Sequence, residues 1–212
     1  KTAYEIMPSL VGSEMCIRDS IQIDCIRRLR AHEGETSKLL RTNFVLIDFT
    51  SLEDRQAWIF IASFSFRGGS IPFYGRVLGK QDIDEMKYPS QNEFILECLS
   101  QLIQILPFKP VFVGDREFGC ERFIRFLLDR NVGFIFRLPR GRKVEKEGKE
   151  VKVEDLPNGS HIVSWKGMKL KVCIKQKKDD PWILLCPSVF RREKLSDGES
   201  QGAQKQVLEC SA

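Results

Sequence analysis

The sequence lacks any apolar run long enough to cross a bilayer. A membrane-spanning helix needs about 18 or more consecutive apolar residues, and the 212 residues contain no such run. The N-terminus also lacks the charged, apolar and small-residue regions of a secretory signal peptide. These absences argue against a membrane-spanning or secreted protein, and we expect a cytoplasmic one.

Paired cysteines and clustered histidines are missing as well. The seven cysteines are odd in number and scattered, and they form no Cys-x-x-Cys pair. Neither a disulfide framework nor a zinc site is therefore expected. The two histidines, His32 and His161, lie far apart without a nearby partner motif. We expect reduced, mostly buried thiols and no catalytic histidine.

Charge is present in mild excess, but it is unevenly placed. The chain carries 34 Lys and Arg against 29 Asp and Glu, a formal net charge of +5. Residues 137–178 hold thirteen Lys and Arg against five Asp and Glu, a local balance of +8, which leaves −3 for the rest. Such a segment indicates either a phosphate-binding surface or a solvated, charged hairpin region, and charge alone favours neither.

The two ends of the chain differ in texture from its middle. Residues 1–20 show no sustained period, and the stretch PSLVGSEMCIRDS resembles a translated sequencing adapter, although an ordinary terminal segment is the alternative. Residues 21–42 form a polar lead-in. Residues 189–212 are polar with little apolar periodicity, which is typical of a disordered tail or one read in a shifted frame.

The middle of the chain predicts a mixed sheet covered by helices. Three runs rich in strand formers, 44–50, 58–66 and 70–79, follow one another with short connections and predict an antiparallel meander. The stripe of apolar residues over 92–106 then predicts an amphipathic helix. A strand before Asp115, a helix over 121–131 and a strand over 134–138 complete a β-β-β-α-β-α-β order for residues 43–138. This α/β order is similar to that of the ribonuclease H-like fold.

After Leu138 the sequence predicts a basic β-hairpin subdomain, inserted over residues 139–188. Short strand patterns occur at 150–153, 161–165, 169–174 and 182–186. The pairs Asn158-Gly159 and Lys166-Gly167 are typical hairpin turns.

Two aspartates lie where chemistry is expected. Asp48 interrupts the first apolar strand, and a carboxylate there is costly unless it is paired, binds a metal ion or points outward. Asp115 follows the run 111–114, at the carboxyl end of a strand, where α/β sheets place ligand-binding groups; a helix cap is the alternative. If the first and fourth strands are neighbours, the two carboxylates converge into a hard-oxygen site suited to Mg²⁺ or Mn²⁺.

The two acidic segments carry a specific resemblance. VLIDFTSL (45–52) and VFVGDREFG (111–119) resemble the first and second acidic motifs of bacterial DDE transposases of the insertion-sequence-four family. The Gly-Asp-Arg-x-Phe-Gly run is the more specific of the two, and the strand ending in Arg137-Leu138 also fits. The resemblance covers roughly residues 40–190, including the β-rich insertion.

The resemblance implies a DNA transposase, an endonuclease and strand-transfer enzyme of DNA recombination. In such an enzyme Asp48 and Asp115 hold two Mg²⁺ or Mn²⁺ ions, which activate a water or DNA hydroxyl and stabilise the leaving oxygen. It further implies binding of double-stranded DNA at transposon ends and target, a homodimer, and a nucleoid-associated place in a bacterial cytoplasm.

The third carboxylate of the family is not evident. It is a Glu in a Tyr-x₂-Arg-x₃-Glu-x₆-Lys signature on a helix, and the nearest candidate, Glu193, lacks that spacing. We therefore expect a C-terminally truncated, inactive fragment.

The basic segment supplies the candidate DNA-binding residues, although each is also compatible with a solvated surface charge. They are Arg116, Arg137, Arg140, Lys143, Lys169 and Lys171. Two other interpretations stay open: a ribonuclease H-like nuclease without strand transfer, and a non-catalytic remnant that only binds DNA.

Overall fold

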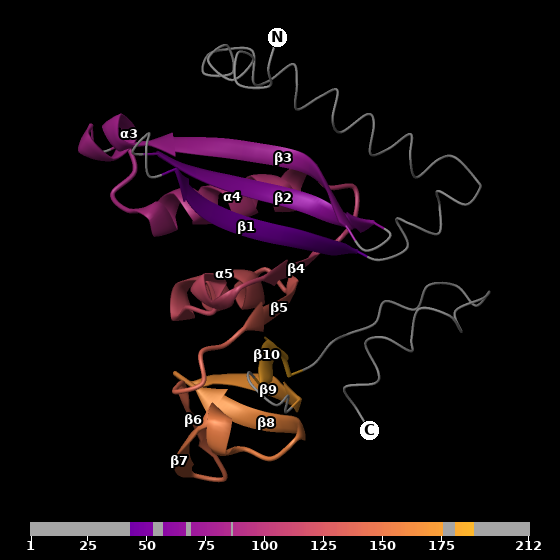
Figure 1. The fold of residues 1–212 in the computed structure, drawn as a ribbon. Helices are drawn as coiled ribbons and strands as arrows, with labels where there is room; N and C mark the ends of the chain where they lie inside the picture. Colours follow the sequence, from indigo (N-terminus) through magenta and orange to yellow (C-terminus); the bar gives the residue numbers. More distant parts are fainter. Residues whose placement is uncertain (1–42, 53–56, 67–68, 86, 176–180, 189–212) are drawn as a thin grey trace, which may run out of the picture. The chain divides into compact units, whose positions relative to one another are not determined.

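The computed structural model describes residues 43–52, 57–66, 69–85, 87–175 and 181–188 (Figure 1). The chain divides after Pro110 into two compact units, called here unit 1 and unit 2. The expectations for residues 1–20, 21–42 and 189–212, and for Glu193, fall outside the described residues. Among the described residues, no helix has both the length and the apolarity needed to cross a membrane.

In the residues that the structure describes, unit 1 is a three-stranded antiparallel meander with one long helix. Its strands are β1 (Phe44–Leu52), β2 (Ala57–Phe66) and β3 (Gly69–Gly79), in the order β3-β2-β1. The predicted meander is thus confirmed. A short helix that was not predicted, α3 (Lys80–Asp84), leads to α4 (Gln91–Ile105), which lies behind the strands in Figure 1. Ser90 caps α4 by accepting a hydrogen bond from the Glu93 amide at 3.3 Å.

The core of unit 1 lies between α4 and the meander. The apolar stripe of α4 is buried as its period predicts: Phe94, Ile95, Cys98, Leu99 and Leu102. Phe94 meets Phe49 of β1 with 6.3 Å between ring centroids. Burial alternates along β1, so Val45, Ile47 and Phe49 point into the core and Asp48 points away from it.

The described part of unit 2 is a mixed sheet with one α-helix. It contains β4 (Val111–Gly114), the 3-10 helix η4 (Arg116–Phe118), α5 (Glu121–Asp129) and β5 (Gly133–Arg137). It continues with β6 (Lys143–Lys146), β7 (Lys149–Lys152), η5 (Val153–Asp155), β8 (Gly159–Trp165), β9 (Met168–Lys175) and β10 (Trp182–Pro187). The strand order is β4-β5-β10-β9-β8-β6-β7, with β4 and β5 parallel and the other neighbours antiparallel. The protein is therefore a mixed α/β protein with few helices.

The segment expected as an insertion continues the sheet of unit 2. β10 pairs with β5 through Leu184–Arg137 and Leu185–Phe136, so the predicted boundary at residue 139 lies inside this unit. The hairpin turn at Lys166-Gly167 is confirmed, with φ of 53° and 78°. The Asn158-Gly159 prediction is wrong, because β8 follows η5 and pairs with β9 and β6 instead of forming a hairpin with β7.

Candidate nucleic-acid interface

One face of unit 2 gathers cationic side chains from strands that are distant in the sequence. β9 reads MKLKVCIK, and its alternate residues Met168, Leu170, Val172 and Ile174 are buried. Successive side chains of a strand point to opposite sides of the sheet. Lys169, Lys171, Cys173 and Lys175 therefore share the outer side of β9.

The register of the neighbouring strands fixes which side chains accompany these lysines. Lys169 is opposite Ser164 of β8, and Lys171 is between Ile162 of β8 and Cys186 of β10. Cys173 is between Ser160 and Leu184, and Lys175 is opposite Trp182. Leu184 pairs in turn with Arg137 of β5, so this row reaches a fourth strand. We call this surface the basic face. Its members are Arg137, Ser160, Ile162, Ser164, Lys169, Lys171, Cys173, Lys175, Trp182, Leu184 and Cys186.

The four strands of the basic face supply no carboxylate to it, and its nearest acidic neighbour in the register is Glu145 of β6, opposite Ser164. Indeed β5, β8, β9 and β10, as described, include no Asp or Glu at all. Lys169 and Lys175 are exposed, whereas Lys171 and Arg137 are half-buried. The three lysines of β9 outnumber the one acidic thiol of this row, that of Cys173, and give the face a net positive potential that would attract phosphate.

A row of polar groups crosses the centre of the basic face. The Ser160 hydroxyl lies 3.4 Å from the Cys173 sulfur, and the Cys186 thiol hydrogen-bonds with Cys173. The Cys186 sulfur also lies 3.6 Å from the Lys171 carbonyl oxygen. The hydrogen bond from Cys186, then that from Ser160, then the charge of Lys171, outweigh burial and lower the pKa of Cys173 to about 6. The sequence predicted reduced, mostly buried thiols, and this pair was not predicted.

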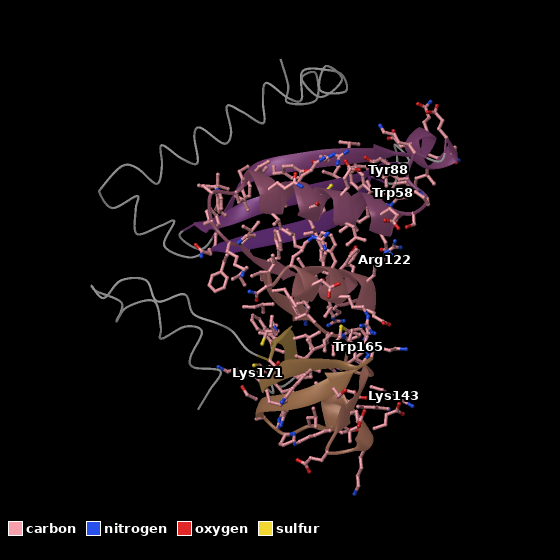
Figure 2. All side chains as sticks on the ribbon, turned by 180° about the vertical axis from the view of Figure 1, so that it is seen from behind. Trp58, Tyr88, Arg122, Lys143, Trp165 and Lys171 are labelled. Carbon is pink, nitrogen blue, oxygen red and sulfur yellow. The ribbon has the colours of Figure 1, made fainter. Side chains whose placement is uncertain are left out.

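The structure brings together three of the six predicted DNA-binding residues. Arg137, Lys169 and Lys171 lie on the basic face. Lys143 lies on β6, where Glu150 of β7 holds its ammonium at 2.8 Å. Arg116 begins η4, and Arg140 is exposed after β5. Lys171 and Lys143 are far apart across unit 2 in Figure 2.

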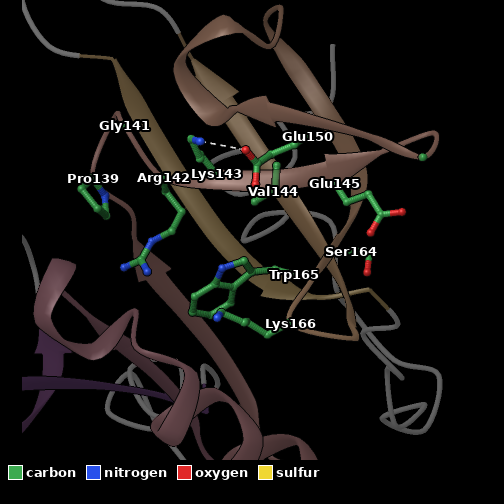
Figure 3. A pocket seen from close by; sticks show the side chains of 11 residues that line it. Pro139, Gly141, Arg142, Lys143, Val144, Glu145, Glu150, Ser164, Trp165 and Lys166 are labelled. Carbon is green, nitrogen blue, oxygen red and sulfur yellow. Dashed lines mark hydrogen bonds and ion pairs between the residues drawn. The ribbon is translucent and has the colours of Figure 1, made fainter.

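Unit 2 also has an open hollow of about 780 Å³ between β6 and β8. Figure 3 shows Arg142 beside the Trp165 ring, at 4.8 Å from guanidinium carbon to ring centroid. The Arg142 guanidinium donates to the Gly119 carbonyl at 3.3 Å, and its Nε is buried without a partner. Lys143 and Glu150 neutralise one another at its rim. The hollow is therefore less positive than the basic face.

The two candidate metal ligands belong to different units. In unit 1, Asp48 is exposed on the outer side of β1, so burial imposes no cost on its charge. The Thr50 hydroxyl donates to its Oδ2 at 2.9 Å. This contact gives Thr50 of the Asp-x-Thr pattern a defined role, since it orients the carboxylate.

In unit 2, Asp115 is exposed at the end of β4, as its place in the sequence predicts. It occupies the N-cap position of η4, but its side chain makes no capping hydrogen bond. Asp115 is thus at a helix cap position, as the alternative interpretation predicted, but its carboxylate does not act as the cap. Within the described ranges, no three His, Cys, Asp or Glu side chains are grouped closely enough to hold a metal ion.

The remainder of the Asp-Arg-x-Phe-Gly motif is structural. Phe118 is 1% exposed and contacts Phe123 of α5 and Phe136 of β5, with centroids 6.1 and 5.9 Å away. A Cβ on Gly119 would lie 3.2 Å from the carbonyl oxygens of both Arg116 and Arg137. Phe118 and Gly119 therefore hold η4 against β5, and Asp115 is presented from this support.

Comparisons with known proteins give distant similarities. No protein family and no curated protein matches the chain. Endonuclease V of Bacillus subtilis matches at 10% identity and a TM-score of 0.36, over 68% of this chain and 63% of its own. Endonuclease V of Ciona intestinalis, solved with a 24-residue DNA containing an inosine followed by a ribo-adenosine, matches at 14% identity and a TM-score of 0.34, over 83% of each chain. This chain thus spans less than two thirds of the bacterial enzyme, and neither likeness is close enough to assign a fold or an activity.

Proposed function

We propose that this chain is part of a DNA-processing protein and that it binds nucleic acid through the basic face. The observation that carries the proposal is that Lys169, Lys171 and Lys175 of β9 and Arg137 of β5 share one side of four adjoining strands that contain no Asp or Glu. Phosphate contacts by Lys and Arg dominate the affinity of proteins for nucleic acid. Lysines two residues apart on a strand are about 7 Å apart, so Lys169 and Lys171 can each meet a different phosphate of one strand.

The test compares lysines that lie on the basic face with one that does not. Binding of a fluorescein-labelled 20-base-pair duplex is measured by anisotropy. Joint replacement of Lys169, Lys171 and Lys175 by Ala is expected to weaken binding about 10- to 100-fold. The control is Lys149→Ala, an exposed lysine of β7 in the same unit. Equal losses per lysine removed, on the face and off it, would contradict the proposal.

The second function that we propose is metal-dependent phosphodiester cleavage and strand transfer by a ribonuclease H-like DDE transposase. Two observations favour it: Thr50 orients the exposed Asp48 carboxylate, and the exposed Asp115 that follows β4 makes no side-chain capping hydrogen bond to η4. Both are hard oxygen donors, and their chemistry fits Mg²⁺ or Mn²⁺. Asp48 and Asp115 would hold the ions, whose chemistry is activation of a water or hydroxyl at the phosphodiester. Arg116, beside Asp115, would contact the phosphate.

Binding of Mn²⁺ tests this second function without requiring turnover. We expect weak binding by isothermal titration, because two carboxylates hold a divalent ion less tightly than three. Asp48→Asn and Asp115→Asn should each abolish it, whereas Asp129→Asn at the exposed end of α5 should not. If both variants bind Mn²⁺ as the parent does, the metal site is wrong. If metal binds and plasmid DNA is cut but never joined, a nuclease replaces the transposase.

The missing third carboxylate has its own test. Sequencing the source locus across both ends of this reading frame would show whether Tyr-x₂-Arg-x₃-Glu-x₆-Lys is encoded downstream in any frame. Its presence would support a transposase with double-stranded transposon ends as substrate and a dimer as the active species. Its absence would leave the DNA-binding function alone.

A further inference from the structure

The basic face also presents large apolar side chains to solvent. In the described part of unit 2, the large hydrophobic side chains that are exposed are Trp182, at 50%, and Ile162, at 48%. Both are members of the basic face. Neither hydration of this surface nor contact with phosphates accounts for the exposed side chains of Trp182 and Ile162.

The register places these two side chains on either side of the lysine row. Trp182 of β10 is the direct partner of Lys175, and Ile162 of β8 is the direct partner of Lys171. Directly opposed side chains have Cβ atoms about 4.5–5.5 Å apart. The lysines of β9 are thus flanked by an aromatic ring on one side and an aliphatic chain on the other, on one side of a sheet.

Duplex and single-stranded nucleic acids differ in what they offer such a surface. In a duplex the bases stack on one another, and a protein meets only phosphates and the base edges in the grooves. In a single strand the base faces are accessible, and they stack on exposed aromatic side chains while lysines follow the backbone. Lysines interleaved with an exposed tryptophan fit the second kind of ligand.

We infer that the basic face binds single-stranded nucleic acid, with the backbone along the lysines of β9 and a base stacked on Trp182. The inference rests on the proposed nucleic-acid binding of this face and adds the class of ligand. The polar side chains of Ser160 and Ser164 lie on the same face of β8 and are within the path of the backbone. The Ser164 hydroxyl can donate to a phosphate oxygen, which adds to the fit, whereas that of Ser160 lies against the Cys173 sulfur.

The test compares two probes of the same length, a single-stranded (dT)₂₀ and a 20-base-pair duplex, on the intact chain. We expect (dT)₂₀ to bind at least about 10-fold more tightly than the duplex. Trp182→Ala should weaken (dT)₂₀ binding about 5- to 100-fold, the range for loss of one stacked base, and should leave duplex binding nearly unchanged. Val77→Ala, which shortens an equally exposed apolar side chain of unit 1, is the matched control.

Tryptophan fluorescence gives a second readout that does not depend on affinity. Of the three tryptophans, Trp165 is buried and Trp58 half-buried, so stacking should quench mainly Trp182. Trp182→Phe should keep most of the affinity for (dT)₂₀ but lose the quenching. If Trp182→Ala unfolds the chain, Ile162→Ala serves in its place, with a smaller loss of (dT)₂₀ binding expected.

The outcomes separate this inference from the function on which it rests. Equal affinity for both probes, or no effect of Trp182→Ala on (dT)₂₀, overturns the single-strand inference and leaves nucleic-acid binding intact. Binding of neither probe overturns both. Binding of (dT)₂₀ that is lost in the lysine variants but insensitive to Trp182 shows a purely electrostatic surface and also rejects the inference.

Discussion

At the scale of residues, Cys173 is the side chain whose chemistry differs most from what its sequence context indicates. Lys171 and Lys175 flank it on β9, and Arg137 of β5 ends the same row. The neighbouring strands bring Ser160 and His161 from β8 and Cys186 from β10. A hydrogen bond links the two thiols and shifts both of their pKa values. Cys173 also has a hydrogen bond with the Ser160 hydroxyl, so we assign the thiolate to Cys173. The pKa of Cys186 is raised, first of all by its hydrogen bond with Cys173.

The first prediction concerns the reactivity of Cys173. Because thiolates react and thiols do not, alkylation of Cys173 should be rapid above about pH 6 and should fall as the pH drops through this value. Iodoacetamide labelling of each cysteine between pH 5 and 9, followed by peptide mass spectrometry, measures it. Ser160→Ala and Cys186→Ala should move the midpoint upward. Buried Cys98, whose pKa burial raises to about 12, is the unreactive reference.

A labelling midpoint near the ordinary thiol value of about 8.5 would contradict this assignment. Formation of a disulfide with Cys186 is not the expected fate of Cys173. The register makes them diagonal neighbours, for which Cα atoms are about 7–8 Å apart, beyond the usual range for a disulfide.

Residue positions show what the sequence could and could not predict about the candidate site. The alternation in MKLKVCIK is enough to place Lys169 and Lys171 on one side of a strand. Arg137 joins them only through the pairing of β5 with β10, which are separated by more than forty residues. Likewise, the ion pair that occupies Lys143 depends on the β6–β7 register. Local periodicity carries no information about either pairing.

At the scale of elements, α4 is attached to β3 by a polar network as well as by its apolar stripe. The Arg76 guanidinium of β3 lies 2.8 Å from the Glu97 carboxylate of α4 and 2.8 Å from the Tyr88 hydroxyl, and it covers the Phe94 ring at 5.0 Å. The Gln101 amide donates to the same carboxylate at 3.0 Å. The Arg76 side chain is 11% exposed and that of Glu97 is 41% exposed.

The second prediction is that Glu97→Ala destabilises the chain by about 1 kcal/mol. Removing the carboxylate leaves the buried guanidinium with the Tyr88 hydroxyl, and half-exposure of Glu97 keeps the loss at the low end of the range for charged hydrogen bonds. Urea unfolding measures it. Gln104→Ala, at an exposed position of the same helix, is the control for helix propensity.

The pH dependence of this network has a definite sign. Burial opposes ionisation of Glu97, but hydrogen bonds from Tyr88 and Arg76 outweigh it and lower the pKa of the carboxyl. The stabilisation is therefore complete above the ordinary pKa of 4.5 and is lost as the pH falls below it. A parent and a Glu97→Ala variant with the same difference in stability at pH 3 and pH 7 would contradict the assignment.

The elements that were missed share a physical cause. β6 reads KVEK and has a single apolar residue, so its strand identity depends on β7 and β8 on either side. η4 and α3 are shorter than the windows in which a helical period can be recognised. In contrast, α4 and β9 have long amphipathic patterns, and their types and approximate bounds follow from the sequence.

At the scale of the whole molecule, charge distribution matters more than net charge. The net charge of +5 combines +8 in residues 137–178 with −3 elsewhere. Many of the acids within the basic segment occur on β6, β7 and η5, whereas β8, β9 and β10 are free of them. The local excess of charge can be counted in the sequence, but the sheet pairing is what places Arg137 beside the three lysines of β9 on one face.

The last prediction separates attraction by the net charge of the chain from attraction by contacts on the basic face, through the salt dependence of binding. If Arg137 and the three lysines of the basic face each neutralise a phosphate, log Kd should change with log salt concentration by about 2.8 for a single strand, or about 3.6 for a duplex. Lys171→Ala should reduce this slope by about 0.7 to 0.9. Lys149→Ala removes the same unit of net charge from a strand outside the face and should leave the slope unchanged. Equal reductions in the two variants would mean that the ligand responds to the overall field of the chain rather than to contacts on the basic face.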